Sequence, residues 1–203
     1  MMETIKNIIF DFGGVIVNLN KQAAIDAFNE IGFKAEEYIG DYVQTGIFSG
    51  LELGTMTEED FDRFVCRQAG HEVGADTIRN AWNRMLTDIP LRRMKAIKRL
   101  RERYHIYMLS NTNRIHWDYS CRHLFPQEEW RPEDCFERIF LSFEMHLMKP
   151  DPEVFRHVLD ATRVQPEETL FVDDSATNCT VAQDAGLRVF HSRRPDDWLE
   201  IIK

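Results

Sequence analysis

Cysteine is scarce in this sequence, and its few cysteines are scattered. No two of them form a Cys-x-x-Cys pair, which argues against a zinc site and against a disulfide framework. Reduced thiols in a reducing compartment are the simpler interpretation. The four cysteines are Cys66, Cys121, Cys135 and Cys179.

Long apolar runs and a secretory signal are also lacking. No apolar stretch approaches the roughly 20 residues that a membrane-spanning helix needs, so we expect no membrane partner. The apolar stretch 8–17 is interrupted by Asp11 and preceded by Glu3, a pattern unlike that of a signal peptide. We therefore expect a cytoplasmic protein.

The sequence has fewer basic than acidic residues. Lys and Arg number 25 against 34 Asp and Glu, which gives a formal net charge of −9. This balance argues against a nucleic-acid binder, because phosphate backbones require concentrated positive charge. A small phosphorylated substrate is still compatible, since it responds to a local field. The basic cluster between residues 92 and 103 is interpreted as the solvated face of a helix.

Five short apolar runs alternate with helical patterns along the chain. The runs show no polar alternation, which is typical of parallel strands covered on both faces. Helices are predicted between them, for example after Asp151-Pro152 and between Ser175 and Gly186, which suit helix starts and a helix end. The sequence therefore predicts an α/β fold with a doubly wound parallel sheet. The apolar runs are 8–10, 106–109, 139–141, 170–172 and 189–190.

The region from about residue 21 to residue 88 has a different pattern. It contains amphipathic helical segments and no convincing strand. We interpret residues 19–88 as a helical cap inserted after the first strand, and residues 1–18 and 89–203 as the α/β core. Three glycines predict a loop between cap helices. They are Gly46, Gly50 and Gly54.

Polar side chains follow the predicted strands at the edge where ligands bind in open parallel sheets. Three clustered carboxylates repel one another, and a hard divalent ion such as Mg²⁺ would compensate their charge. The sequence therefore predicts a magnesium site at this edge. The residues concerned are Asp11 after the first strand, Ser110 and Asn111 after the second, Lys149 beyond the third, and Asp173 and Asp174 at the fourth.

This set of groups suits phosphoryl transfer. Magnesium neutralises phosphate oxygens and lets an anionic nucleophile approach an anionic substrate. Asp11 would attack phosphorus and form an aspartyl-phosphate that water then cleaves. Ser110, the amide of Asn111 and Lys149 would hold the remaining phosphate oxygens. Structural roles are the alternative, since Asp11 could cap a turn and Asp173-Asp174 could be an acidic pair at a helix start.

Four segments resemble, in the same order, the motifs of haloacid dehalogenase-like (HAD-like) hydrolases. They are IFDFGGV at 9–15, LSNT at 109–112, MKP at 148–150 and FVDDS at 171–175. The resemblance implies a Rossmann-like core with a small α-helical cap. The second and third motifs look most similar to bacterial phosphatases of α-D-glucose 1-phosphate and related sugar phosphates. A magnesium-dependent phosphatase acting on a small phosphorylated metabolite is therefore the expected function.

The resemblance also implies individual roles. Asp11 matches the nucleophile and a metal ligand, and Gly13 matches the position whose carbonyl reaches the metal. Ser110 matches the phosphate-binding hydroxyl, and Lys149 the cation that steadies nucleophile and phosphate. Asp174 matches the direct metal ligand of the last motif. Two further positions match supporting contacts to the metal, namely Asp173 and Asn178.

Gly13 departs from the usual motif, which has a second Asp there as general acid and base. Three explanations are open: a binding protein that has lost activity, a dehalogenase, or a phosphatase whose leaving group needs little protonation. We favour the phosphatase, because a metal-free displacement at carbon has no use for paired ligand carboxylates. An anomeric hydroxyl also leaves more readily than an ordinary alcohol. The isolated histidines 116, 123 and 146 are interpreted as packing or surface residues.

Two expectations concern the whole molecule. The cap, through the segment 45–52, should close over the site and exclude water. The protein should be a monomer or a weak homodimer.

Overall fold

The computed structural model describes residues 4–40, 44–125 and 130–201. Within these residues, five parallel strands form one sheet in the order β3-β2-β1-β4-β5. All five apolar runs predicted to be strands are confirmed. The strands are β1 (Asn7–Phe10), β2 (His105–Ser110), β3 (Arg138–Leu141), β4 (Thr169–Asp173) and β5 (Arg188–His191).

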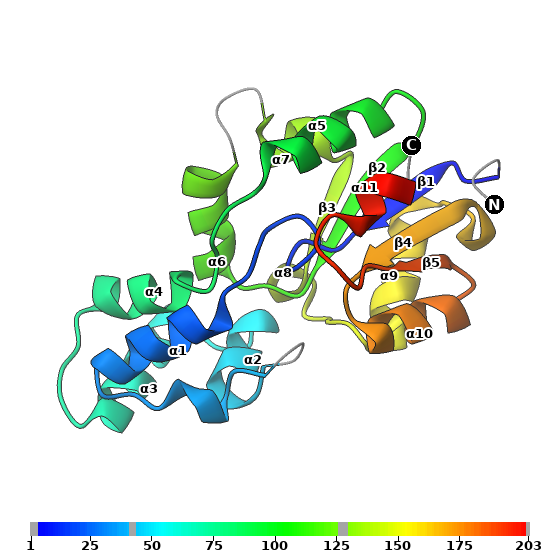
Figure 1. Cartoon of the computed structure of the whole chain (residues 1–203). Coiled ribbons are helices and arrows are strands. Elements are labelled where there is room, and N and C mark those ends of the chain that lie inside the picture. The colour runs from blue at the N-terminus through cyan, green and yellow to red at the C-terminus, as the bar shows by residue number, and fades with distance from the viewer. Residues whose placement is uncertain (1–3, 41–43, 126–129, 202–203) are drawn as a thin grey trace.

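Helices cover both faces of the sheet, as expected for a doubly wound fold (Figure 1). Ile8 and Phe10 of β1 point to one face and Ile9 to the other, because successive side chains of a strand alternate. On the first face lie α5 (Leu91–Leu100), α7 (Pro132–Cys135) and α11 (Asp197–Ile201). On the second lie α9 (Pro152–Thr162) and α10 (Ala176–Asp184), and the short η4 (Pro166–Glu168) precedes β4.

The helices of the core begin at the predicted capping residues. Asp151 accepts a hydrogen bond from the backbone N–H of Glu153, and Ser175 accepts one from that of Asn178. Gly186, with a φ of 90°, follows α10 and turns the chain toward β5. Because α10 begins directly after β4, its first turn lies at the sheet edge where Asp173 and Asp174 are.

The helices from α1 to α4 lie to one side of the sheet (Figure 1). They pack around a separate aromatic cluster. Phe28, Phe48, Phe61 and Trp82 at its centre are all fully buried. The chain enters this group of helices near Asn18 and leaves it near Asp88. These two segments lie side by side, because the backbone N–H of Asn18 donates a hydrogen bond to the carbonyl of Asp88. The division into core and cap at residues 18 and 88 stays a prediction. The cap helices are α1 (Lys21–Glu30), α2 (Gly46–Glu52), α3 (Glu58–Ala69) and α4 (Ala75–Asn83), with η1 at Ala35–Glu37.

The predicted glycine loop in the cap is wrong for Gly46 and Gly50, whereas Gly54 does lie in the turn between α2 and α3. Residues 46–52 form α2, because Phe48 and Leu51 are drawn into the aromatic cluster and this burial outweighs the low helix propensity of glycine. Gly54 follows α2 with a φ of 66°, and a Cβ there would lie 2.2 Å from the carbonyl oxygen of Phe143. Phe143 belongs to α8 (Ser142–Met145), so the end of α2 contacts the core directly.

The interpretation of the basic cluster 92–103 as a solvated face is wrong for one residue. Arg93 has no exposed surface, and its Nε donates to Asp196 Oδ1 over 2.6 Å. Its Nη1 also donates to the carbonyl of Ile16 over 2.9 Å. The arginine therefore joins α5, the loop after β1 and the C-terminal segment.

The connection between β2 and β3 packs against the core. It contains α6 (Arg114–Tyr119) and the π-helical η2 (Ser120–Leu124), and the ring of Trp117 lies 5.7 Å from that of Phe12. Among the described helices, none combines the length and the apolar character needed to cross a membrane.

Candidate active site

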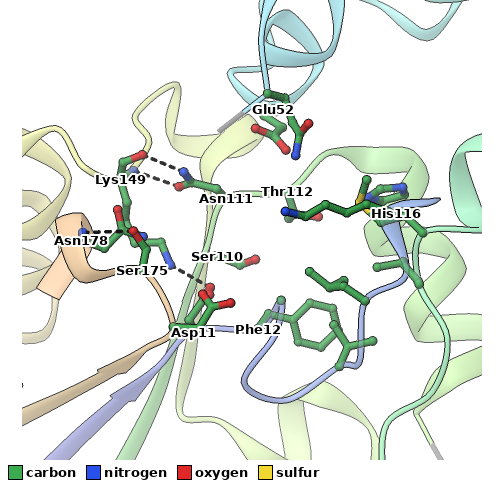
Figure 2. A pocket seen from close by; sticks show the side chains of 18 residues that line it. Asp11, Phe12, Glu52, Ser110, Asn111, Thr112, His116, Lys149, Ser175 and Asn178 are labelled. Carbon is green, nitrogen blue, oxygen red and sulfur yellow. Dashed lines mark hydrogen bonds and ion pairs between the residues drawn. The ribbon is translucent and has the colours of Figure 1, made fainter. Parts of the chain in front are cut away.

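A pocket of about 90 Å³ lies beyond the carboxyl ends of β1, β2 and β4, under α2 of the cap (Figure 2). Each strand contributes the residue that follows its apolar run, which is why groups distant in sequence meet here. The core side of the pocket is formed by Asp11, Gly13, Ser110, Asn111, Lys149 and Asp174. All of these were predicted site residues.

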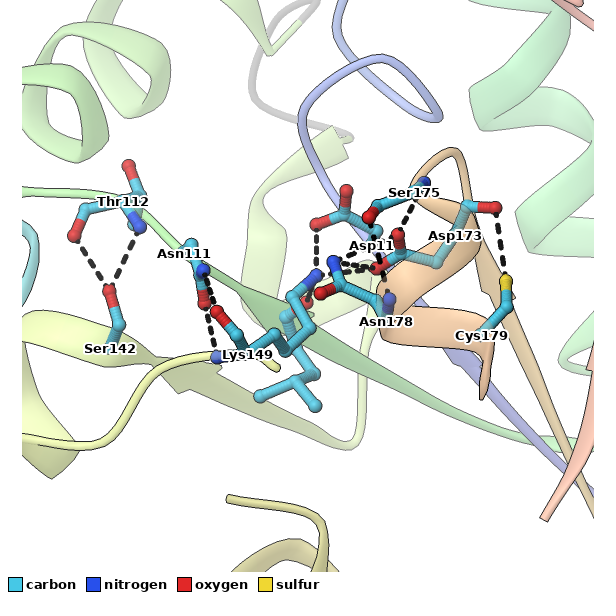
Figure 3. Close-up of polar contacts among 10 residues, drawn as sticks. Asp11, Asn111, Thr112, Ser142, Lys149, Asp173, Ser175, Asn178 and Cys179 are labelled. Carbon is cyan, nitrogen blue, oxygen red and sulfur yellow. Dashed lines mark hydrogen bonds and ion pairs between the residues drawn. The ribbon is translucent and has the colours of Figure 1, made fainter. Parts of the chain in front are cut away.

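Lys149 joins two of the acidic residues. Its Nζ donates to Asp11 Oδ1 over 2.7 Å, to Asp173 Oδ2 over 2.8 Å and to the carbonyl of Leu109 over 3.0 Å (Figure 3). Burial alone would lower the pKa of Lys149, but the two carboxylates more than offset this and raise it above its ordinary value. Lys149 is therefore a permanent buried cation beside Asp11.

Asp173 is saturated with hydrogen bonds. Oδ1 accepts from the backbone N–H of Ser175 over 2.8 Å and from Asn178 Nδ2 over 3.0 Å, while Oδ2 accepts from Lys149. The side chain is fully buried. These contacts point to a residue that positions Lys149 and the start of α10, and they leave little capacity for a bond to a metal.

Three carboxylates approach one another closely at this edge. Single oxygens of Asp11, Asp173 and Asp174 all lie within 4.8 Å of one another. Burial raises the pKa of Asp11, the neighbouring acids raise it further, and Lys149 opposes the shift. Burial and Asp173 likewise raise the pKa of Asp174 to about 6. Because one lysine compensates only part of this charge, the donor set fits a divalent cation bound by Asp11 and Asp174.

Two glycines shape the loop after β1. Gly14 has a φ of 74°, and a Cβ there would lie 2.2 Å from Asp174 Oδ2. Only glycine therefore leaves the Asp174 carboxylate in place. A Cβ on Gly13 would lie 3.3 Å from Leu19 Cδ1, so an apolar side chain stands beside the position that lacks the acid.

The side chain of Asn111 binds the backbone of Lys149. Its Nδ2 donates to the carbonyl of Lys149 over 2.7 Å, and its Oδ1 accepts from the backbone N–H of Lys149 over 2.9 Å. The side chain therefore holds the backbone of the lysine, which leaves the main-chain N–H as the group for a phosphate. Ser110 is buried, ends β2 and lines the pocket, as the phosphate role requires.

The cap contributes pocket residues that sequence reasoning missed. Gln44 and Glu52 are both buried in the wall opposite Asp11, and Gln44 Oε1 has no hydrogen-bond partner among the described residues. Burial raises the pKa of Glu52 to about 8, which Lys149 only partly opposes. The sequence pointed to this wall only through the expectation that the segment 45–52 closes over the site. That expectation named no side chain.

His116 also lines the pocket, yet its contacts agree with the packing role expected for it. The ring stacks on Trp82 with centroids 4.3 Å apart, and Nε2 lies 3.1 Å from the carbonyl oxygen of Trp82. Burial lowers the pKa of this imidazole to about 4. The ring is therefore neutral at neutral pH.

Comparison with protein families settles the origin of this arrangement. Residues 5–186 match the model of the haloacid dehalogenase-like hydrolase family. The chain belongs to the HAD-like hydrolases. The resemblance carried by the four motifs is thus confirmed over most of the chain, and so is the Rossmann-like core.

Relatives of this HAD-like hydrolase cover nearly its whole length. The D-ribitol-5-phosphate phosphatase of Bacteroides thetaiotaomicron is 35% identical over 195 residues, which are 96% of this chain and 95% of that protein. The sesquiterpene phosphatase of Aspergillus oryzae is 27% identical and covers 94% of this chain and 91% of its own.

Solved structures give the same result. A HAD family enzyme from Bacteroides thetaiotaomicron, in complex with magnesium and inorganic phosphate, superposes with a TM-score of 0.91 at 39% identity and covers 98% of this chain and 100% of its own. L-2-haloacid dehalogenase from Xanthobacter autotrophicus reaches a TM-score of 0.60 at 20% identity, over 92% of this chain and 77% of its own. The second likeness shows a shared fold alone.

Proposed function

We propose that this chain is a magnesium-dependent phosphatase that hydrolyses a small sugar or polyol phosphate through an aspartyl-phosphate on Asp11. The observation that carries the proposal is the pairing of Lys149 with both Asp11 and Asp173, next to the carboxylate of Asp174. A buried lysine between acids from two strand ends has a clear use in phosphoryl transfer. The substrate class is supported by the relative acting on D-ribitol 5-phosphate.

The metal fits the donor set of the site. Asp11, Asp174 and the backbone carbonyl of Gly13 would hold Mg²⁺, with Asp173 and Asn178 in support behind them. Bound magnesium supplies charge neutralisation for the phosphate oxygens. The structural neighbour that contains magnesium and inorganic phosphate supports this assignment.

Side chains and backbone groups of the site would carry out the remaining steps of the reaction. Lys149 occupies Oδ1 of Asp11, which leaves Oδ2 to attack phosphorus as the bond to the leaving oxygen breaks. Ser110 and the main-chain N–H of Asn111 would hold phosphate oxygens. The side chain of Asn111 holds the backbone of Lys149 in place through two hydrogen bonds. Water then attacks phosphorus, releases inorganic phosphate and restores Asp11.

The finer expectations about the environment of the enzyme stay predictions. These are a cytoplasmic location and a monomeric or weakly dimeric state. The deficit of positive charge argues against nucleic acid as the partner and is compatible with a small phosphorylated metabolite.

The test is release of phosphate from a panel of sugar and polyol phosphates with and without Mg²⁺. Asp11→Asn should remove turnover while the circular-dichroism spectrum stays unchanged. Asp26→Asn is the matched control, because Asp26 is an exposed acid on α1 that bonds to Gln22. Turnover by Asp11→Asn close to wild type would exclude Asp11 as the nucleophile. Absence of any beryllofluoride or phosphoryl adduct on wild-type Asp11 would instead support a non-catalytic binding protein.

A further inference from the structure

Cleavage of a sugar or polyol phosphate requires a proton for the leaving oxygen. An ordinary alcohol is a poor leaving group, and a positioned acid contributes a rate factor of about 10² to 10⁴. Gly13 has no side chain, and Leu19 lies beside it at 3.3 Å from the place of a Cβ. A positioned acid must therefore come from another part of the pocket wall. This inference rests on the proposed function.

Most ionisable groups in the wall are committed to other contacts. Of the described residues, six ionisable ones line the pocket: Asp11, Lys21, Glu52, His116, Lys149 and Asp174. Asp11 and Asp174 are the proposed nucleophile and metal ligand, and the pairing of Lys149 with two carboxylates holds its protons firmly. Lys21 lies near Asp174 and compensates its charge.

His116 and the hydroxyl groups are unsuitable as acids. The Nε2–H of His116 is used by the carbonyl of Trp82, and the buried ring stays neutral. The hydroxyls of Ser110, Thr112 and Ser175 are no more acidic than the alcohol that has to be protonated. Glu52 is the group that is left.

Glu52 has the placement that a leaving-group acid needs. It is the last residue of α2 and lies across the pocket from Asp11 and Ser110, on the side that faces away from the sheet (Figure 2). Its side chain is 7% exposed. Within the part of the chain that the structure describes, no hydrogen bond engages its carboxyl group.

The backbone around Glu52 is fixed by the core. Gly54 contacts the carbonyl of Phe143, and the carbonyl of Leu53 lies 2.8 Å from His146 Nδ1. Phe48 and Leu51 anchor the same helix in the aromatic cluster. A carboxyl group on a fixed backbone, 7% exposed and without a partner among the described residues, is unusual unless a ligand completes its contacts.

We propose that Glu52 is the general acid and base of the reaction and acts from the cap in place of a side chain at Gly13. The Glu52 carboxyl proton moves to the leaving oxygen while the Asp11 Oδ2–P bond forms and the P–O ester bond breaks. The Glu52 carboxylate then takes a proton from the water that attacks phosphorus. This second step breaks the Asp11–phosphorus bond, frees inorganic phosphate and returns Glu52 to its acid form.

The electrostatics of the pocket agree with this role. Burial raises the pKa of Glu52 to about 8, so the acid form predominates at neutral pH. Lys149 faces Glu52 and opposes that shift. Other ionisable groups around it are Glu144 on α8, which packs against α2, and His146 directly after α8. The pocket wall adds Asp11, Lys21, His116 and Asp174.

The test compares two leaving groups in the first turnover, with magnesium present. One substrate is D-ribitol 5-phosphate or the best polyol phosphate of the panel, and the other is 4-nitrophenyl phosphate, whose leaving group needs no proton. With Glu52→Gln, alcohol release should fall by about 10²-fold or more, whereas the nitrophenolate burst should stay within about threefold of wild type. The alkaline decline of alcohol release in wild type, near pH 8, should vanish in the variant.

Glu144→Gln is the matched control, because Glu144 is an exposed acid on α8, next to α2. An equal loss for both substrates, or no loss for either, overturns the role of Glu52. If Glu52→Gln misfolds, wild type alone decides: weak dependence of the first turnover on leaving-group pKa supports an acid, and steep dependence refutes it. Failure of wild type to form an adduct on Asp11 would instead refute the proposed function.

Discussion

Replacing Gly14 with alanine should disable the metal site through a single methyl group. The new Cβ would lie 2.2 Å from Asp174 Oδ2 and 2.9 Å from its Cγ, about 1 Å closer than van der Waals contact allows. The Asp174 carboxylate must therefore move away from Asp11. Since a displacement of about 1 Å in a catalytic group can cost about 10²-fold in rate, we expect a loss of that order in kcat/KM.

The backbone penalty of the same substitution can be measured separately. Gly14 has a φ of 74°, and a left-handed conformation costs a non-glycine residue about 1 to 2 kcal/mol. Gly70, at the end of α3, has a φ of 76° with nothing within 4 Å of its Cβ position. Gly70→Ala therefore carries the same penalty without the clash and serves as the control.

The assay is urea unfolding of both variants and of wild type, with and without Mg²⁺. A metal that binds only the native state at 100 times its Kd stabilises it by about 2.7 kcal/mol. Wild type and Gly70→Ala should gain this stabilisation, and Gly14→Ala should lose most of it together with turnover. Equal gains in all three proteins, with full activity of Gly14→Ala, would refute the assignment of Asp174 as a metal ligand.

Three further predictions concern stability. Lys149→Met leaves the buried carboxylates of Asp11 and Asp173 unpaired. Without metal it should therefore lower the free energy of unfolding by about 3 to 5 kcal/mol. A loss below 1 kcal/mol in urea unfolding would contradict the pairing. Arg93→Met should cost about 3 kcal/mol and leave KM unchanged, whereas the exposed Lys95→Met should cost less than 0.5 kcal/mol; equal losses would show that the Asp196 contact is unimportant. The folded-state pKa of His116, about 4, lies below its ordinary value, so the unfolded chain binds the extra proton and stability falls as pH drops from about 6.5 toward 4. From pH 7 to pH 5 the loss from this group should be about 2 kcal/mol, and His116→Gln should lack it.

The sheet and the core of the site could be predicted because their signals are local. Each strand is an apolar run, and a polar residue at its end must lie at one edge of a parallel sheet. Asp11, Ser110 and Asp174 were found in this way. Their grouping at one edge required only that the strands be parallel.

What the sequence did not reveal depends on contacts between distant segments. The amide of Asn111 was assigned to phosphate, whereas the bond from its side chain to the backbone of Lys149, a partner 38 residues away, was not foreseen. Arg93 lies among exposed basic residues, and only the position of Asp196 after β5 explains its burial. Helix α2 forms against glycine propensity, because the aromatic cluster surrounds it. Glu52 was missed for the same reason.

The proposed acid on the cap changes how the glycine at position 13 is explained. The sequence alone suggested that an easily departing anomeric hydroxyl makes a second acid unnecessary. Glu52 would supply the proton from the opposite wall, so that an ordinary alcohol could leave as well. The dependence of rate on leaving group separates the two explanations, since only the first predicts steep dependence in wild type.

The position of Glu52 at the end of α2 has a kinetic consequence. Asp11 and Ser110 belong to the strand ends, whereas Glu52 reaches the pocket from the helices on its other side. Any displacement of α2 relative to the sheet would therefore change the distance from Glu52 to the leaving oxygen. If that displacement limits turnover, solvent viscosity should slow a fast substrate more than a slow one.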